Sequence, residues 1–227
     1  MNRILAHAAV LLTAAACVRF TPGVVTPPPV NTAELPIGSD AAADSLLADV
    51  RSFSPQIVVT LRYATPNNFT GAPINGYEGN HAYLRTQAAV ALARVETDLA
   101  PKGLGLKIFD AYRPVRATDA MVEWTKRVGR DDLLRDGYIA RRSRHNLGLA
   151  VDLTLIRLSD STELEMGTPF DTFSVTAHTA NATGLAAENR QLLKSAMERE
   201  GFTNYDQEWW HFTFALPDQL RFDRVVR

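Results

Sequence analysis

The sequence predicts one α+β domain in which helices pack on a mainly antiparallel sheet. Segments with strand and helix periodicity alternate along the chain, but two of the connections are too irregular for the repeated strand–helix–strand units of a parallel sheet. Hydrophobic residues make up 46% and charged residues 22% of the 227 residues, a composition that builds a buried core. The single cysteine excludes a disulfide scaffold.

The charge balance leaves no overall attraction to nucleic acid. The chain has 24 Lys and Arg against 25 Asp and Glu, a formal net charge of −1. Nucleic-acid-binding proteins usually have more basic than acidic residues, so we expect no nucleic-acid partner. The function must therefore come from a local site.

The first element is an export signal over residues 1–16. Arg3 precedes an apolar run from Ile4 to Ala16, which is shorter than the roughly 20 residues that span a bilayer. An N-terminal helix of the folded domain is the alternative, but prolines follow at once from Pro22 onward. We expect a secretory signal peptide and an exported protein, located in the periplasm or the cell envelope.

Cys17 lies at the end of this apolar run. The preceding alanines permit ordinary cleavage, which gives a soluble secreted protein, or lipoprotein cleavage, which leaves Cys17 carrying lipid and holds the protein on a membrane. Ala14 stands where a bacterial lipoprotein signal usually has Leu. A lone exported cysteine has no disulfide partner, so we expect lipid at Cys17. Residues 17–40 are expected to form a Pro-rich tether, and 41–227 the folded domain.

Within the domain, two helices are well defined by their sequence. From Thr86 to Ala100 one helical face is apolar, and Pro101 and Gly103 end the helix. The members of this face are Ala88, Leu92, Val95 and Leu99. Pro114 suits the first turn of the next helix. The inner face expected for it consists of Ala117, Met121, Trp124 and Val128.

The remaining elements are predicted from segments rich in β-branched residues and from the Gly and Pro residues at which segments end. Further helices are expected at 40–50 and at 185–200, the second closed by Gly201. Strands are expected at 56–63, 106–112, 149–155 and 208–214.

The segment SRHNLGLAVDLTL carries an acid in apolar surroundings. If side chains alternate along a strand, Val151 and Leu153 point into the core and Asp152 is left among apolar neighbours. A buried carboxylate is costly unless it pairs with a cation or binds a metal, and His145 is a suitable co-ligand. The alternative is that Asp152 pairs with Arg144 and that His145 is an exposed loop residue.

Two other segments also carry polar groups. In EWWHF, Glu208 and His211 lie within an aromatic run that excludes water, which indicates shifted pKa values or a nearby metal. A core strand with two satisfied polar residues is the alternative. Arg113, where a strand ends and a helix begins, can clamp an oxyanion or a carboxylate, although most such arginines pair only with surface acids. Together, His145, Asp152 and His211 would make the open three-ligand site of a catalytic zinc.

These residues resemble a known family. The pattern S-x-H-x-x-G-x-A-x-D from Ser143 to Asp152, followed by E-x-W-H from Glu208 to His211, is similar to the zinc D-alanyl-D-alanine dipeptidases of peptidase family M15, which include vancomycin-resistance dipeptidases. The similar blocks occur in family order between residues 56 and 214; they are LRYATPNNFTG, DAYRPVRA, SRHNLGLAVDLTL, MGTPFD and EWWHF. The resemblance implies a Hedgehog/DD-peptidase-like fold.

The resemblance also implies hydrolysis of D-alanyl-D-alanine to two D-alanines, linked to peptidoglycan metabolism. It implies one zinc ion per chain on His145, Asp152 and His211. Glu208 is then the general acid and base, and Arg113 stabilises the transition state. The matching substrate-contact positions are Tyr63, Ser143 and Asp171. Ser143 as a nucleophile is a tempting alternative, but its nearby base, His145, is better used on the metal.

Other functions remain open from the sequence. A zinc D,D-carboxypeptidase acting on peptidoglycan stem peptides would need an open channel where a dipeptidase binds the free ammonium of its substrate. Asp171, helped by the Tyr63 hydroxyl, is the candidate for that ammonium, although a turn cap next to Thr172 is the alternative. A non-catalytic wall-binding lipoprotein would need the metal ligands but not Glu208, and a lipoprotein that only anchors a partner would need neither. The signal and tether depart from shorter cytoplasmic members of the family.

Overall fold

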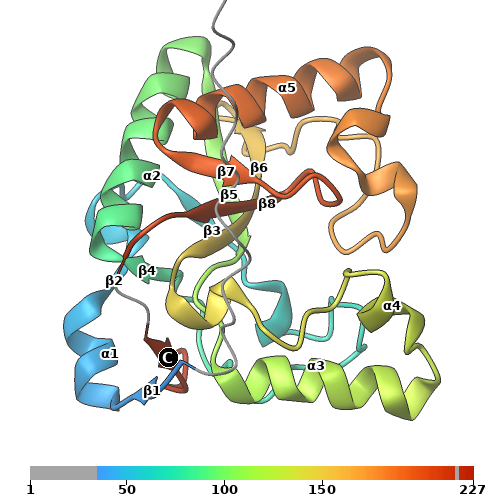
Figure 1. Cartoon of the computed structure of the whole chain (residues 1–227). Coiled ribbons are helices and arrows are strands. Elements are labelled where there is room, and N and C mark those ends of the chain that lie inside the picture. Colours follow the sequence, from blue (N-terminus) through green and yellow to red (C-terminus); the bar gives the residue numbers. More distant parts are fainter. Residues whose placement is uncertain (1–34, 218–219) are drawn as a thin grey trace, which may run out of the picture. The chain divides into compact units, whose positions relative to one another are not determined.

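The computed structural model describes residues 35–217 and 220–227 (Figure 1). The expected signal peptide, Cys17 and most of the expected tether lie outside the described residues. Every element described below belongs to one compact unit. No helix within the described ranges is long and apolar enough to cross a membrane.

The sheet at the centre of the domain has five strands in the order β3-β5-β6-β8-β7. Three of its four pairings are antiparallel and the pairing of β3 with β5 is parallel. The sheet is therefore mixed but mainly antiparallel, which confirms the predicted α+β class. The bounds are β3 (Val58–Val59), β5 (Leu104–Asp110), β6 (Ala150–Arg157), β7 (Phe202–Asn204) and β8 (His211–Phe214).

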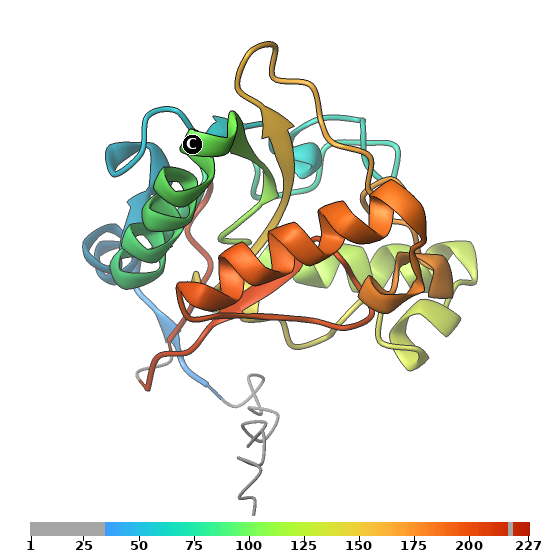
Figure 2. The same ribbon diagram turned by 90° about the horizontal axis from the view of Figure 1, so that it is seen from above.

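Helices lie on both sides of these strands. Helix α2 packs against β5 and against α5, and α5 also packs on β7, as the view from above shows (Figure 2). In Figure 1 the helices α3 and α4 lie below the strands and α5 lies above them. The bounds are α2 (Thr86–Leu99), α3 (Val115–Val128), α4 (Asp132–Arg135) and α5 (Gly184–Arg199).

Smaller elements surround this core. Strand β1 (Ile37–Gly38), inside the range expected for the tether, pairs with β9 (Arg221–Phe222). Helix α1 (Asp40–Leu46) is shorter than expected, because the next three residues form strand β2 (Leu47–Asp49) and pair with β4 (Tyr83–Arg85).

Helix α2 agrees with its predicted pattern. All four residues of its apolar face are buried, and Gly103, in the left-handed region at φ 70°, ends the short 3-10 turn that follows the helix.

The inner face of α3 differs from the expectation. Ala117 and Met121 are buried, but Val128 is 46% exposed and Trp124 is only partly buried. The buried face is rotated toward threonines whose hydroxyls are satisfied: the Asn146 side-chain amide donates to Thr118 and the Thr125 hydroxyl donates to a backbone carbonyl. These bonds let polar residues occupy core positions. The additional buried residues are Thr118, Val122 and Thr125.

Two expected strands are shorter in the structure. In the segment 56–63 only the two residues of β3 form a strand. The chain then forms a 3-10 helix, η3 (Arg62–Ala64), which buries Tyr63. Glu208 belongs to a turn rather than to the last strand, since the His211 amide donates to the Glu208 carbonyl and β8 begins at His211. Strand β7 was not predicted.

A β-bulge in β5 aligns two acidic residues of neighbouring strands. Ile108 pairs with Leu153, but the next pair is Asp110 with Asp152, so Phe109 is the extra residue. The bulge places two carboxylate side chains on adjacent positions of neighbouring strands. Both faces of β6 are covered, because every residue from 150 to 156 is buried.

Candidate active site

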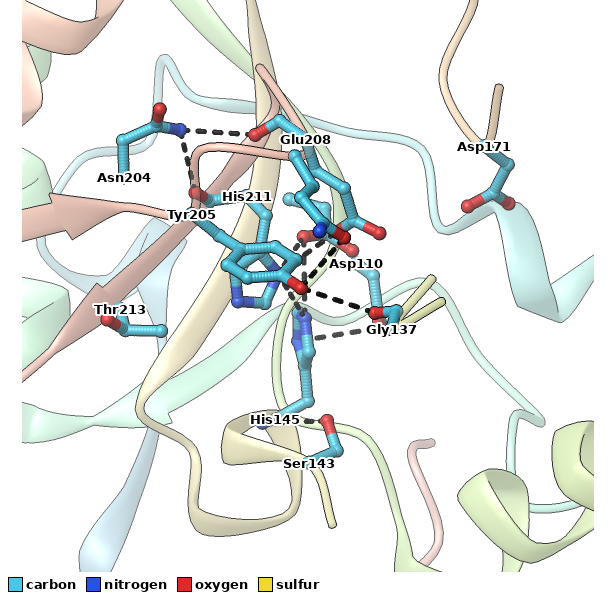
Figure 3. Close-up of polar contacts among 12 residues, drawn as sticks. Asp110, Gly137, Ser143, His145, Asp171, Asn204, Tyr205, Glu208, His211 and Thr213 are labelled. Atoms are coloured by element: carbon cyan, nitrogen blue, oxygen red, sulfur yellow. Dashed lines mark hydrogen bonds and ion pairs between the residues drawn. The ribbon is translucent and has the colours of Figure 1, made fainter. Parts of the chain in front are cut away.

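The three predicted metal ligands meet at one point, and Figure 3 shows two of them, His145 and His211. Asp152 of β6 is paired directly with His211 at the start of β8, and His145 comes from the 3-10 helix η5 (Arg144–Leu147). His211 Nδ1 lies 2.9 Å from Asp152 Oδ1 and 3.2 Å from His145 Nε2. One ligand atom from each residue lies within 4.8 Å of the others.

The orientation of His145 is set by its backbone partners. Its Nδ1 donates to the Ala111 carbonyl at 2.6 Å, so Nε2 keeps its lone pair and faces the other two ligands. Ser143 begins η5 by accepting from the His145 amide at 3.2 Å. Gly148 ends η5 with φ 67°, and a Cβ there would lie 2.4 Å from a Leu47 methyl. Only glycine fits this turn.

The donor set fits zinc. Burial alone would raise the pKa of Asp152, but the two adjacent imidazoles hold that pKa well below its ordinary value, so the carboxylate is ionised. Two imidazole nitrogens and one carboxylate oxygen leave room for a further ligand, as in catalytic zinc sites. The ion pairs of Asp152 are with His145, His211 and Arg113, rather than with Arg144. His145 is 2% exposed and is not a surface loop residue.

Arg113 is held beside the ligands by a buried acid. Its Nε and Nη2 lie 2.9 and 2.8 Å from Asp110 Oδ2, and Nη2 lies 3.8 Å from Asp152. Asp110 is fully buried and also accepts from the Tyr77 hydroxyl at 2.6 Å. The guanidinium carbon lies 5.1 Å from the centre of the Tyr63 ring. Arg113 is thus a fixed cation at the metal centre rather than one half of a surface ion pair.

Asp110, labelled in Figure 3, was not predicted from the sequence. Its carboxylate holds Arg113 and lies 3.5 Å from His145 Nδ1. The signal that could have found it is an acid three residues before Arg113, at the end of a buried strand.

Glu208 lies in the turn before β8. It is 9% exposed, and its Oε2 is 3.8 Å from His211 Nδ1. Burial, followed by the carboxylates of Asp152 and Asp171, raises the pKa of Glu208 well above its ordinary value, although Arg113 acts in the opposite direction. A carboxylate whose pKa is raised in this way accepts a proton more readily than an exposed one.

Asp171 lies on a neighbouring loop (Figure 3). Its Oδ1 accepts from the Tyr63 hydroxyl at 3.0 Å, whereas its Oδ2 is buried with no hydrogen-bond partner among the described residues. Its backbone is in the left-handed region at φ 60°. Burial and the charge of Asp152 raise the pKa of Asp171 to about 8. The side chain bonds a tyrosine 108 residues away rather than capping the turn next to Thr172.

Comparison with known proteins places the chain in a family. The D-ala-D-ala dipeptidase profile of peptidase family M15 matches residues 43–226. The chain belongs to this family. A D-alanyl-D-alanine dipeptidase of Enterococcus faecium is 36% identical over 66% of this chain and 82% of its own length. One of Streptomyces coelicolor is 33% identical over 78% and 91%.

Membership of the D-ala-D-ala dipeptidase family makes the protein a zinc metallopeptidase, and His145, Asp152 and His211 are the described residues that fit the ion. A solved vancomycin-resistance D,D-dipeptidase, in complex with a D-Ala-D-Ala phosphinate analogue, is 16% identical with a TM-score of 0.39 over 74% of this chain and 66% of the other. That likeness is too weak to bear on the site.

Proposed function

We propose that this protein hydrolyses free D-alanyl-D-alanine to two D-alanines as part of cell-wall metabolism. Its family and the D-alanyl-D-alanine dipeptidases it resembles support the reaction. The observation that carries the choice of a dipeptide is the partnerless Oδ2 of Asp171, a buried acceptor beside the metal centre. An unsatisfied buried carboxylate oxygen is costly, and a cationic ligand removes that cost.

The metal ligands are His145, Asp152 and His211 in this proposal. A zinc ion bound there supplies a Lewis acid and brings the pKa of a coordinated water to about 7. The bond from His145 Nδ1 to the Ala111 carbonyl leaves Nε2 as the nitrogen that would bind the ion.

Glu208 moves the proton. Its Oε2 lies 3.8 Å from Nδ1 of His211. It accepts a proton from the attacking water and delivers it to the leaving amine of the second D-alanine. The same burial that raises the pKa of Glu208 lets the proton reside there between the two transfers.

Arg113 stabilises the negative charge that develops on the peptide oxygen. Its guanidinium is already desolvated and oriented by Asp110, so little reorganisation accompanies the reaction. A charged, fixed fork of donors of this kind is well suited to an oxyanion.

Asp171 and Tyr63 bind the free ammonium of the substrate. The Tyr63 hydroxyl donates a hydrogen bond to Asp171 Oδ1, which leaves Oδ2 to accept from the ammonium. Phe69 and Phe170 pack on the Tyr63 ring with centroid distances of 6.0 Å each, so the tyrosine that bonds Asp171 is held by neighbouring aromatic rings.

Ser143 contacts the substrate in this proposal. Its hydroxyl accepts from the His145 amide, which leaves its O–H free to donate to a substrate carbonyl or carboxylate. Its position at the start of η5 fits such a contact and does not require it to act as a nucleophile.

We also propose export and a membrane anchor at Cys17, for which the sequence is the only support. Labelling of cells with a fatty-acid analogue tests the anchor. The wild-type protein should take up the label and Cys17→Ser should not. Label that persists in Cys17→Ser, or full-length protein in the cytoplasm, would contradict the anchor.

The proposed reaction is tested by measuring D-alanine release from two substrates by the purified zinc protein. Free D-alanyl-D-alanine should be turned over, and a pentapeptide stem ending in the same dipeptide should not. Comparable turnover of the stem would identify a carboxypeptidase, and binding of either substrate without turnover would identify a non-catalytic wall-binding protein.

A further inference from the structure

The loop that carries Asp171 is fastened by a single buried arginine. This loop, residues 166–178 and called here the Asp171 loop, leaves and rejoins the domain beside helix α5. Arg190 of α5 is only 2% exposed, and its guanidinium donates to backbone carbonyls at both ends of the loop. Nε donates to Met166 O at 2.7 Å, Nη1 to His178 O at 2.7 Å and Nη2 to Thr176 O at 3.1 Å.

The partners of Arg190 are unusual for a buried cation. In the part of the chain that the structure describes, its hydrogen bonds go to these carbonyls and, at 3.5 Å, to the Thr168 hydroxyl rather than to a carboxylate. Burying a guanidinium without a counter-ion is costly. The three donor nitrogens of the guanidinium lie in one rigid plane, so their hydrogen bonds fix the separation of the two loop ends.

The loop is also shaped to receive this guanidinium. Gly167 has φ 81°, and a Cβ there would lie 3.1 Å from the Ala186 methyl and 3.3 Å from Arg190 Nη2. The absence of a side chain at Gly167 therefore lets the loop backbone approach α5 and the guanidinium closely.

The same anchor is connected to the catalytic turn. Trp209, which follows Glu208, donates from Nε1 to the Thr168 hydroxyl at 2.9 Å, and its ring lies 5.9 Å from the Arg190 guanidinium carbon. The backbone amide of Trp209 donates to Ala177 O at 3.1 Å. Between these fastened ends, Asp171 sits in a left-handed conformation that a free loop would leave.

We infer that Arg190 is a positioning residue that sets the selectivity for a free N-terminal ammonium by holding the Asp171 loop at both ends. The inference rests on the proposed role of Asp171. Without the guanidinium, the loop ends separate and Asp171 loses its fixed distance to the metal centre. Small displacements of this kind cost up to about 10²-fold in rate.

The test uses Arg190→Lys, because lysine keeps the charge but its single ammonium cannot reach carbonyls at both loop ends. Free and N-acetylated D-alanyl-D-alanine are the two substrates. We expect kcat/KM for the free dipeptide to fall by roughly 10- to 100-fold, mainly through KM, with no matching fall for the acetylated one and with bound zinc unchanged. The control is Arg199→Lys on the same helix, whose side chain is 50% exposed and 4.0 Å from Asp98; it should behave as wild type.

A purely structural role for Arg190 would lower the melting temperature and leave the ratio of the two kcat/KM values intact, which would overturn the inference. If Arg190→Lys is insoluble, Gly167→Ala perturbs the same guanidinium and carries the same expectations. Asp171→Asn is measured in parallel. If it keeps the selectivity, the ammonium role of Asp171 fails and the inference fails with it. If Asp171→Asn loses the selectivity and Arg190→Lys keeps it, the inference alone fails.

Discussion

Asp110 and Asp152 are cross-strand partners on β5 and β6, and the shortest polar contacts of their carboxylates go to different groups. Asp152 faces the two histidines, whereas Asp110 is bonded to Arg113 and to the Tyr77 hydroxyl. Like charges on neighbouring strands repel, so each needs its own cation. The bulge at Phe109 thereby places the metal ligand Asp152 beside Asp110, the carboxylate that holds Arg113.

Removal of any one metal ligand should empty the site. His145→Ala, Asp152→Ala and His211→Ala each remove one of three protein ligands, so metal analysis of the purified variants should find well under one zinc per chain. His81→Ala is the matched control, because this histidine is half exposed and pairs with Asp49 away from the site. Stoichiometric zinc in all three ligand variants would refute the assignment.

Glu208→Ala should keep zinc and lose turnover. The change removes the proton carrier but no ligand, so we expect kcat to fall by roughly 10²–10⁴. Glu198→Ala, on the exposed part of α5, should leave both zinc and kcat unchanged. Near-wild-type turnover in Glu208→Ala would show that another group moves the proton.

Arg113→Ala should lower kcat by roughly 10²–10³, the cost of one oxyanion donor. The control is Arg116→Ala, on the next turn of the chain, where the guanidinium bonds the exposed Asp223. Steady-state kinetics at saturating dipeptide measure the effect. A change confined to KM would instead assign Arg113 to ground-state binding.

Glu96 should make the stability of the domain depend on pH. This glutamate of α2 is 2% exposed, and burial raises its pKa from 4.5 to about 7. One oxygen accepts from the Leu106 amide at 2.7 Å, and the other has no hydrogen-bond partner in the described part of the chain. Because the folded state holds this proton more tightly than the unfolded state, stability falls as pH rises from 4.5 toward 7 and is level above that.

Glu96→Gln should remove that part of the dependence. Denaturant unfolding at pH 5 and pH 8 gives the free energy of unfolding of both proteins. The free energy of unfolding of the variant, relative to that of wild type, should increase by about 1–3 kcal/mol from pH 5 to pH 8. An equal difference between the proteins at both pH values would mean that Glu96 does not titrate in this range.

The candidate site was largely predictable from the sequence, because its residues are concentrated in short segments whose polar members conflict with apolar neighbours. His145, Asp152 and His211 were predicted in this way, and the structure brings them together. The helical face of α2 was equally predictable, since its periodicity is regular and its neighbours are apolar.

The features that could not be predicted depend on contacts between distant segments. The bulge at Phe109 has no periodic signature, so the alignment of Asp110 with Asp152 was invisible. Strand β3 ends early because the chain turns to bury Tyr63, which bonds Asp171 far along the chain. The buried face of α3 includes Thr118, which depends on an amide from η5.

The proposed dipeptidase activity is tested most directly by comparing free D-alanyl-D-alanine with its N-acetylated form as substrates of the wild-type zinc protein. Acetylation removes the positive charge and adds bulk at the group that Asp171 Oδ2 is proposed to bind. The free dipeptide should be cleaved, and the acetylated dipeptide should be cleaved far more slowly. Equal cleavage of both would contradict the proposed ammonium site and make the protein a carboxypeptidase.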